Sequence, residues 1–182
     1  MIIGTNVTVR NATLHDYRRV LSVVDDWWGG RAMSQGLSRV FFEHFTATSF
    51  VAEDESSGHL AAFLTGFFSQ TFEHEAYIHF VGVSPDRRRE GLGSALCHRF
   101  FSVAHANGCR LVRSATSPVN RQSIAFHLAM GFRIEPGEAE FEGLPIQLDY
   151  PLPGEARVAF TRRLVATHVV LEDGLVRGLL AS

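Results

Sequence analysis

One stretch of the sequence constrains the fold more than any other: a strand-like segment that runs directly into an arginine- and glycine-rich turn. Residues 76–83 form a strong strand pattern, the turn carries Arg88, Gly91 and Gly93, and a helix pattern begins at once. Such a turn leaves main-chain N–H groups unpaired at the positive end of a helix dipole, where anions bind. The glycines let the main chain approach a ligand with no Cβ in the way. The segment therefore predicts a phosphate-binding turn between a strand and a helix.

The rest of the chain predicts a mixed arrangement of strands and helices around this turn. Strands are predicted at 7–10, 49–53, 60–69, 76–83, 111–116, 157–164 and near 146–150. Helices are predicted from Thr13 to Val24, over 37–45, from Leu92 to a terminator at Gly108, and from Asn120 to Met130 with Gly131 as its terminator. This order predicts one mixed α/β domain over residues 1–165 with helices on both faces of its sheet. Residues 166–182 form an extension that could be a strand pair or a helix.

Composition limits the class of protein. The chain has 182 residues, 46% of them apolar, and a formal net charge of −2, so it can bury a core but offers no global attraction to nucleic acid or an anionic membrane. Cys97 and Cys109 have neither metal-ligand nor disulfide spacing. The sequence lacks a bilayer-length apolar stretch and a secretion signal. We therefore expect a cytoplasmic protein without a metal.

Two common phosphate-binding motifs fit the turn poorly. A Walker loop needs Gly-Lys-Ser/Thr, and no lysine follows Gly91 or Gly93. A dinucleotide-binding fingerprint needs a third glycine where this chain has Leu96, and it stands early in a βαβ unit, whereas three predicted strands precede this turn.

A third pattern matches in several places. In register with the turn stand Val83-Ser-Pro85, Asn120, Ser123 and Gly131-Phe132. This ordered combination, spread over roughly residues 7–164, resembles the GCN5-related N-acetyltransferases, whose acyl-CoA loop is Arg/Gln-x-x-Gly-x-Gly/Ala after a strand ending in Val-x-Pro. The resemblance implies a twisted, mostly antiparallel sheet with a splayed strand pair and acetyl-CoA as acyl donor. A homodimer is compatible with it.

The resemblance also implies where coenzyme A binds. The strand ending at Val83 would pair with the pantetheine arm, and main-chain amides from about Arg88 to Ser94 would hold the pyrophosphate. The residues expected to bind the cofactor are Val81, Gly82, Val83, Arg88, Arg89, Glu90, Gly91, Leu92, Gly93, Ser94, Asn120 and Ser123.

Acetyl transfer to an amine requires three things of the protein. An alkylamine with a pKa of about 10.4 must lose a proton, the oxyanion needs a donor, and the thiolate benefits from an acid. The main-chain N–H at or beside Val81 is the expected oxyanion donor. Strict alternation would put Tyr77, His79, Val81 and Val83 on one face of the strand, with Phe80 and Gly82 on the other.

Candidate catalytic side chains lie upstream on the same strand. His79 is the first candidate for general base, with Tyr77 beside it and Glu75 at the mouth of the strand. His127 stands where the family usually has the tyrosine that protonates the thiolate, so it is the candidate acid. The alternatives are a hydrogen-bonded sheet histidine at position 79 and a packing histidine at position 127.

The resemblance also implies that the first two helices and the segment between them line the acceptor pocket. The candidates are Asp25, Asp26, Trp27, Trp28 and Phe41. Carboxylates beside aromatic faces would suit a cationic amine or a flat ring, but an acidic helix end and two packing tryptophans explain the same residues.

The predicted function is acetyl transfer from acetyl-CoA to a primary amine, by direct attack in a ternary complex, with a small molecule as acceptor. Two alternatives remain: acetylation of a peptide N-terminus or lysine, and a non-catalytic domain that binds and senses acyl-CoA.

Overall fold

A computed structural model describes residues 6–164; the predicted extension at 166–182 lies outside the described residues. The strands are β1 (Val7–Asn11), β2 (Phe50–Asp54), β3 (Leu60–Phe68), β4 (Glu75–Val83), β5 (Leu111–Thr116), β6 (Arg133–Ile134), β7 (Ala139–Phe141), β8 (Leu144–Leu148) and β9 (Ala156–Arg163). The helices are α1 (Leu14–Leu21), α2 (Val24–Trp27), α3 (Val40–Glu43), α4 (Leu92–Ala106) and α5 (Arg121–Ala129), with short 3₁₀ turns η1 (Met33–Gly36), η2 (Thr46–Thr48) and η3 (Pro85–Arg87). None of the helices in this part of the chain is long and apolar enough to cross a membrane.

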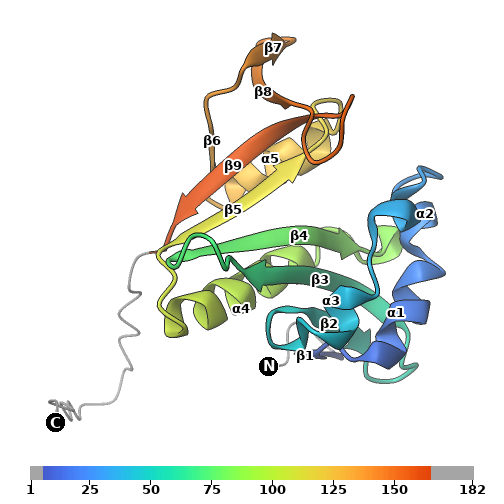
Figure 1. The fold of residues 1–182 in the computed structure, drawn as a ribbon. Helices are drawn as coiled ribbons and strands as arrows, with labels where there is room; N and C mark the ends of the chain where they lie inside the picture. The colour runs from blue at the N-terminus through green and yellow to red at the C-terminus, as the bar shows by residue number, and fades with distance from the viewer. Residues whose placement is uncertain (1–5, 165–182) are drawn as a thin grey trace, which may run out of the picture.

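The strands form one sheet in the order β1-β2-β3-β4-β5-β9-β8-β7, with β6 also paired to β9. Every neighbouring pair is antiparallel except β4 and β5, which run parallel. These two strands pair only as far as Ile78 and Ser114, although β4 continues to Val83. Beyond that point β5 and β9 rise away from β4 (Figure 1). The predicted mostly antiparallel sheet with a splayed strand pair is therefore confirmed.

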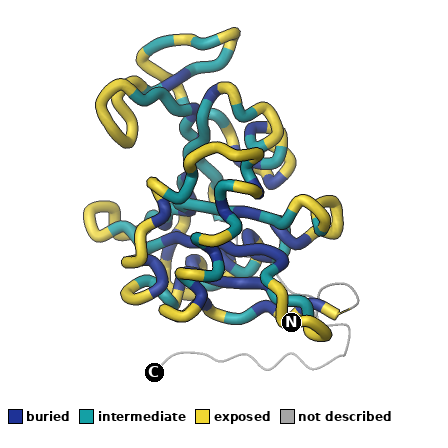
Figure 2. Tube along the Cα trace, turned by 90° about the vertical axis from the view of Figure 1, so that its right-hand side faces the viewer, coloured by how far each residue is buried: buried dark blue, intermediate teal, exposed yellow. Residues whose placement is uncertain are grey.

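Two apolar clusters cover opposite faces of the sheet. On one face α1, α2 and α3 pack through Val20, Val24 and Phe42 against Phe63. On the other face α4 packs across the strands through residues that include Leu96 and Phe100, both fully buried. Buried residues concentrate in the strands of this body, whereas the end of the molecule that holds the β7–β8 hairpin is more exposed (Figure 2). Helices cover both faces of the sheet, as the sequence predicts.

Local signals placed several helix ends correctly. The Asp16 carboxylate accepts hydrogen bonds from the Thr13 N–H and hydroxyl, both at 2.9 Å, so the helix predicted to start at Thr13 is capped there. Asn120 caps α5 by accepting a hydrogen bond from the Ser123 N–H at 3.2 Å. Gly108 and Gly131 follow their helices with φ of 83° and 79°, a conformation that favours glycine.

Three predicted elements differ from the structure. The helix predicted over 37–45 is reduced to the four residues of α3, with the separate turn η1 before it. The neighbouring side chains of Phe41 and Phe42 are both buried there, so contacts with the sheet override a single helical stripe. The first helix also breaks at Ser22–Val23. The strand expected near 146–150 is β8, shifted toward the N-terminus and paired with the unforeseen β7.

Candidate active site

A β-bulge at His79 determines which side chains of β4 face the same way. Thr65 of β3 pairs with Phe80, but the next residue, Gly66, pairs with Ile78, so β4 contains one extra residue at His79. An extra residue reverses the alternation of side chains for the rest of the strand.

The packing of β4 shows this reversal. Phe80 packs nearly perpendicular to the Trp28 ring, on the α2 side of the sheet, and Gly82 lies against the same tryptophan. Val81 and Val83 instead pack into the cluster on the α4 side. The predicted grouping of Tyr77, His79, Val81 and Val83 on one face is therefore wrong beyond the bulge.

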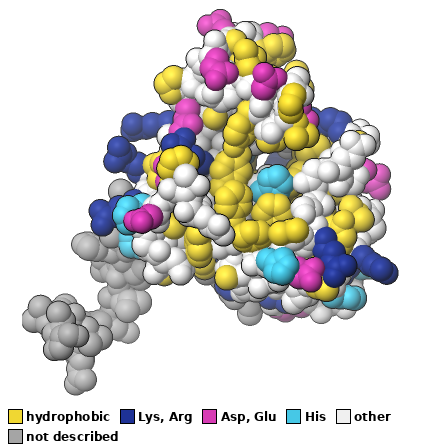
Figure 3. Space-filling view, viewed as in Figure 1, with side chains coloured by type: hydrophobic (Ala, Val, Ile, Leu, Met, Phe, Trp, Pro, Cys, Tyr) yellow, Lys and Arg dark blue, Asp and Glu magenta, His cyan; other side chains and the backbone are white. Residues whose placement is uncertain are grey.

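The separation of β4 from β5 opens a cavity of about 1160 Å³. Among the predicted site residues, those that line it are Trp27, Trp28, Tyr77, His79, Val81, Gly82, Val83, Arg88, Arg89, Gly91, Leu92, Gly93, Ser94, Asn120, Ser123 and His127. The predicted residues Asp25, Asp26, Phe41, Glu75 and Glu90 are not among its lining residues. Apolar side chains gather around the hollow in the middle of the molecule (Figure 3).

The start of α4 provides an anion cradle at one end of this cavity. Gly91 precedes the helix with φ of 81°, and Arg89 has φ of 71°. The N–H groups of Leu92, Gly93 and Ser94 have no hydrogen-bond acceptor among residues 6–164, as expected for the first turn of a helix. A Cβ at Gly93 would lie 3.3 Å from Val83 Cγ2 and 3.4 Å from the Phe126 ring, so glycine permits the close approach of α4 to β4 and α5. These donors fit a pyrophosphate.

The arginines before the helix have different partners. Arg87 pairs with Asp54 at 3.0 Å and with Glu90 at 2.8 Å. Arg88 donates through Nη2 to the main-chain oxygen of Trp27 at 2.6 Å, so it ties the turn to the end of α2. Main-chain amides, rather than these two guanidinium groups, are therefore the donors in position for a phosphate.

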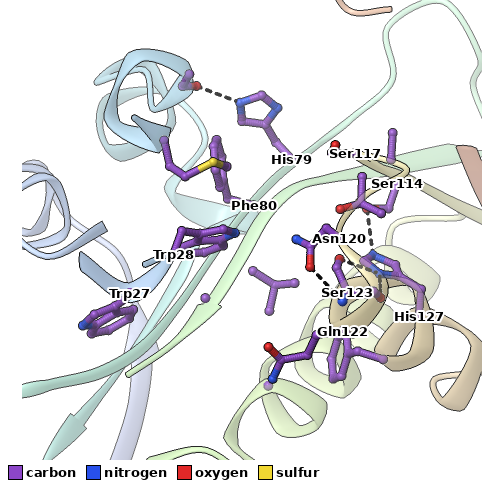
Figure 4. Close-up of a pocket in the computed structure, with 18 of the residues that line it drawn as sticks. Trp27, Trp28, His79, Phe80, Ser114, Ser117, Asn120, Gln122, Ser123 and His127 are labelled. Atoms are coloured by element: carbon purple, nitrogen blue, oxygen red, sulfur yellow. Dashed lines mark hydrogen bonds between the residues drawn. The ribbon is translucent and has the colours of Figure 1, made fainter. Parts of the chain in front are cut away.

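His79 occupies the opposite wall of the cavity (Figure 4). Its ring stacks on Phe41 at 4.6 Å, and Nε2 lies 3.1 Å from the main-chain oxygen of Gly36. A carbonyl oxygen only accepts, so Nε2 carries the proton and Nδ1 of the neutral ring is a free acceptor. Burial lowers the pKa of His79, and the hydrogen bond to Gly36 offsets only part of that effect. The ring is therefore neutral at physiological pH.

The other two predicted groups on β4 have different surroundings. Burial raises the pKa of Tyr77, and the hydrogen bond from the Tyr150 hydroxyl at 2.9 Å acts in the same direction. Tyr77 therefore remains protonated at neutral pH and cannot act there as a base. Glu75 forms an ion pair with Arg113 at 2.7 Å and does not line the cavity.

His127 lines the cavity, but only 3% of its surface is exposed. Its Nδ1 is 2.7 Å from the main-chain oxygen of Ser123, and Nε2 is 3.1 Å from Ser114 Oγ. Ser114 Oγ also lies 3.1 Å from the main-chain oxygen of Ile78. In the neutral ring Nδ1 holds the proton and Nε2 is an acceptor. The single Ser114 hydroxyl proton therefore has two possible acceptors, His127 Nε2 and the Ile78 oxygen. With Nε2 protonated, His127 would donate to Ser114 Oγ and the Ser114 hydroxyl could donate to the Ile78 oxygen. Burial nevertheless lowers the pKa of His127, because its effect exceeds that of the hydrogen bond to the Ser123 oxygen.

The predicted acceptor residues divide into two groups. Trp28 lines the cavity above Gly82, where an added Cβ would lie 2.6 Å from its ring, and Trp27 lies beside it. Asp25 instead accepts hydrogen bonds from the N–H and hydroxyl of Ser34, at 2.7 and 2.8 Å, and these bonds lower its pKa. Phe41 contributes indirectly, through the ring of His79.

The loop between β8 and β9 contributes lining residues that the sequence did not suggest. Tyr150, Leu152 and Glu155 border the cavity, together with Arg157 near the start of β9, although the loop is too rich in glycine and proline to show a periodic pattern. Ser114 was also missed, because its importance comes from its position at the last β4–β5 pair.

Solved structures of acetyltransferases share this architecture. Ard1 from Thermoplasma volcanium is 20% identical, with a TM-score of 0.69 over 88% of this chain and 99% of that one. Diaminobutyrate acetyltransferase from Paenibacillus lautus, solved with its substrate and coenzyme A, is 20% identical, with a TM-score of 0.64 over 88% and 96%. The ribosomal-protein-S18-alanine N-acetyltransferase from Escherichia coli is 18% identical, with a TM-score of 0.60 over 91% and 98%. At these identities the likeness establishes the fold.

The sequence itself establishes the family. No functionally curated protein has a sequence that matches this chain. The model of the acetyltransferase (GNAT) family matches residues 15–132. This range starts in α1, includes the anion cradle at the start of α4, and ends at Phe132, just after α5. The chain therefore belongs to the GNAT family of acetyltransferases, enzymes that use acetyl-CoA as acyl donor.

Proposed function

We propose that the protein transfers an acetyl group from acetyl-CoA to the primary amine of a small molecule, by direct attack within a ternary complex. One observation carries the proposal: amides at the start of α4 that have no partner among residues 6–164, and a neutral histidine on β4, border the same cavity. The amides can hold acetyl-CoA, the acyl donor, and the histidine can take a proton from the acceptor amine.

Coenzyme A would bind along the splay between β4 and β5. The N–H groups of Leu92, Gly93 and Ser94 would hold the pyrophosphate, and the edge of β4 beyond Ile78, which β5 leaves unpaired, would accompany the pantetheine arm. Asn120 and Ser123 line the cavity beside this path. The cofactor supplies the activated acetyl thioester; the protein's own groups supply orientation, hydrogen bonds and proton transfer.

His79 is the proposed general base. Its Nδ1 accepts the amine proton, directly or through one water molecule, while the Nε2–H remains bonded to Gly36. The lowered pKa makes the ring a weak base but keeps it unprotonated at neutral pH. A main-chain N–H at or beside Val81 is the proposed donor to the oxyanion.

His127 is the proposed source of the thiolate proton, acting through Ser114. The Ser114 hydroxyl would give its proton to the departing sulfur and take the Nε2 proton of a protonated His127. Because burial lowers the pKa of His127, this route operates increasingly as the pH falls. At higher pH coenzyme A leaves as the thiolate.

A thermal-shift and turnover experiment tests the proposal. Saturation with acetyl-CoA at about 100 times Kd should add ~2.7 kcal/mol to the free energy of unfolding. Thiol release with a panel of small amines should then exceed hydrolysis of acetyl-CoA alone. Binding without turnover on any amine, peptide N-terminus or lysine peptide would favour an acyl-CoA sensor. Turnover confined to peptides would favour a protein acetyltransferase.

A further inference from the structure

We infer that the acceptor is a monoamine with an aromatic or otherwise apolar body, rather than a diamine, a polyamine or an aminoglycoside. This inference rests on the proposed acetyl transfer to a small amine and narrows the class of acceptor. It follows from the walls and charges of the acceptor half of the cavity, which we define as the part on the α2 side of β4, bordered by Trp28, Met33, Phe67, Tyr77 and Phe80.

The walls of the acceptor half are aromatic and thioether side chains. Phe80 meets Trp28 edge to face, with ring centroids 6.0 Å apart, and Phe67 stacks on Tyr77 at 5.4 Å. Figure 4 shows Trp28, Phe80 and His79 across the cavity from Asn120 and His127, the side assigned to the donor. Such a wall gains free energy from apolar surface and from ring contacts.

The loop between β8 and β9 borders the same half. Tyr150 donates its hydroxyl proton to Tyr77 Oη, so the loop is linked to β4 at this point. Leu152 lines the cavity nearby and keeps 59% of its surface exposed, which leaves apolar area free for an acceptor to cover.

No unpaired carboxylate borders the acceptor half among the described residues. Among the described residues that line the cavity, Glu155 is the one acidic residue, and it forms an ion pair with Arg157. Arg31 and Arg157 also border the cavity, so with Glu155 these three side chains carry two positive charges and one negative charge. The acidic candidates from the sequence are absent from the lining, and Asp25 is bonded to Ser34.

This charge distribution discriminates between amines. The reacting amine must be neutral when it attacks, so it needs no carboxylate partner. A second ammonium group would lose water beside guanidinium groups, with no unpaired carboxylate among the described lining residues to replace it, and contact with the aromatic rings offsets only part of that loss. An apolar body covers the same walls without that cost.

A matched pair of amines tests the inference on the whole chain. 4-Methylbenzylamine and 4-(aminomethyl)benzylamine differ by one distal amino group, and we expect kcat/KM to favour the first by at least about tenfold. Leu152→Glu places a carboxylate at the cavity and should shift the ratio toward the diamine by about tenfold. Leu148→Glu is the control, because Leu148 is an exposed residue that precedes the same loop but does not line the cavity.

The outcomes separate this inference from the proposed function. If the wild-type protein prefers the diamine or an aminoglycoside, or if Leu152→Glu changes the ratio no more than Leu148→Glu does, the inference is wrong while acetyl transfer stands. If acetyl-CoA binds but no amine of the panel, diamines included, releases thiol, the proposed function itself fails.

Discussion

Replacing His79 by glutamine removes the proposed base and keeps the neighbouring hydrogen bond. The glutamine amide N–H can reach the position of Nε2 and donate to the Gly36 oxygen, which lies 3.1 Å from Nε2 in the wild type, but the amide oxygen is not basic enough to replace Nδ1. A positioned general base contributes about 10²–10⁴-fold. The lowered pKa of His79 makes it a weak base, so we expect the lower end, a loss of about 10²-fold in kcat/KM, or ~2.7 kcal/mol.

The loss should depend on pH in one direction. Between about pH 7 and 10 an alkylamine is mostly protonated in solution, while His79 is already neutral. The neutral amine is scarcest at the lower end of this range, so the base contributes most to kcat/KM there. Stopped-time thiol release with the best amine of the panel, at fixed ionic strength, gives kcat/KM for the wild type, His79→Gln and His79→Ala.

The two variants distinguish catalysis from structure. A base at Nδ1 requires both to lose activity to a similar extent, with free imidazole restoring part of it only in His79→Ala, where the site between Phe41 and Phe80 is vacated. If His79→Gln retains wild-type kcat/KM at pH 7 while His79→Ala loses it, the histidine merely holds η1 in place. That result would refute the mechanism.

Three further predictions concern the donor site, the thiolate acid and the fold. Gly93→Val should crowd Val83 and Phe126, cost about 1–3 kcal/mol of stability and raise the Kd for coenzyme A, both measurable by calorimetry. His127→Phe should slow turnover at pH 6 and have little effect at pH 8, because the lowered pKa of His127 means that its ring is protonated only at acidic pH. An equal loss of turnover at both pH values would exclude the relay through Ser114. Asp16→Asn should lower the free energy of unfolding, measured in urea, by about 3–5 kcal/mol. Hydrogen bonds from Arg10 and Thr13 outweigh burial and lower the pKa of the Asp16 carboxyl. The wild type should therefore lose the same contribution as the pH falls below about 4 and this carboxylate is protonated.

Sequence reasoning succeeded where the signal is local. A glycine at φ of 83° ends α4 and an asparagine caps α5, and both features are readable from residue type and spacing. The turn predicted to bind phosphate is local too: Gly91 precedes α4 in the left-handed conformation, as its glycine-rich sequence favours, while phosphate binding there stays a prediction. Each of these depends on contacts between residues a few positions apart.

Sequence reasoning failed where the outcome depends on distant partners. Nothing in residues 75–83 marks the bulge, since it is defined by which residues of β3 pair across it. The carboxylate of Asp25 reads as a ligand for a cation, yet it is bonded to Ser34, nine residues along the chain. Ser114 gains its partners because β5 stops pairing with β4 at that residue.

The bulge separates the two chemical tasks of the cavity. Without the extra residue at His79, strict alternation would turn Phe80 and Gly82 toward α4 and Val81 toward α2. With it, His79 and Phe80 both reach the acceptor half, while Val81 packs on the side of α4 and the anion cradle. The same segment of β4 can then present a base and an aromatic wall to the amine on one face. Its main-chain edge remains available to a thioester in the splay, so a one-residue insertion in a strand would account for the proposed placement of both reactants.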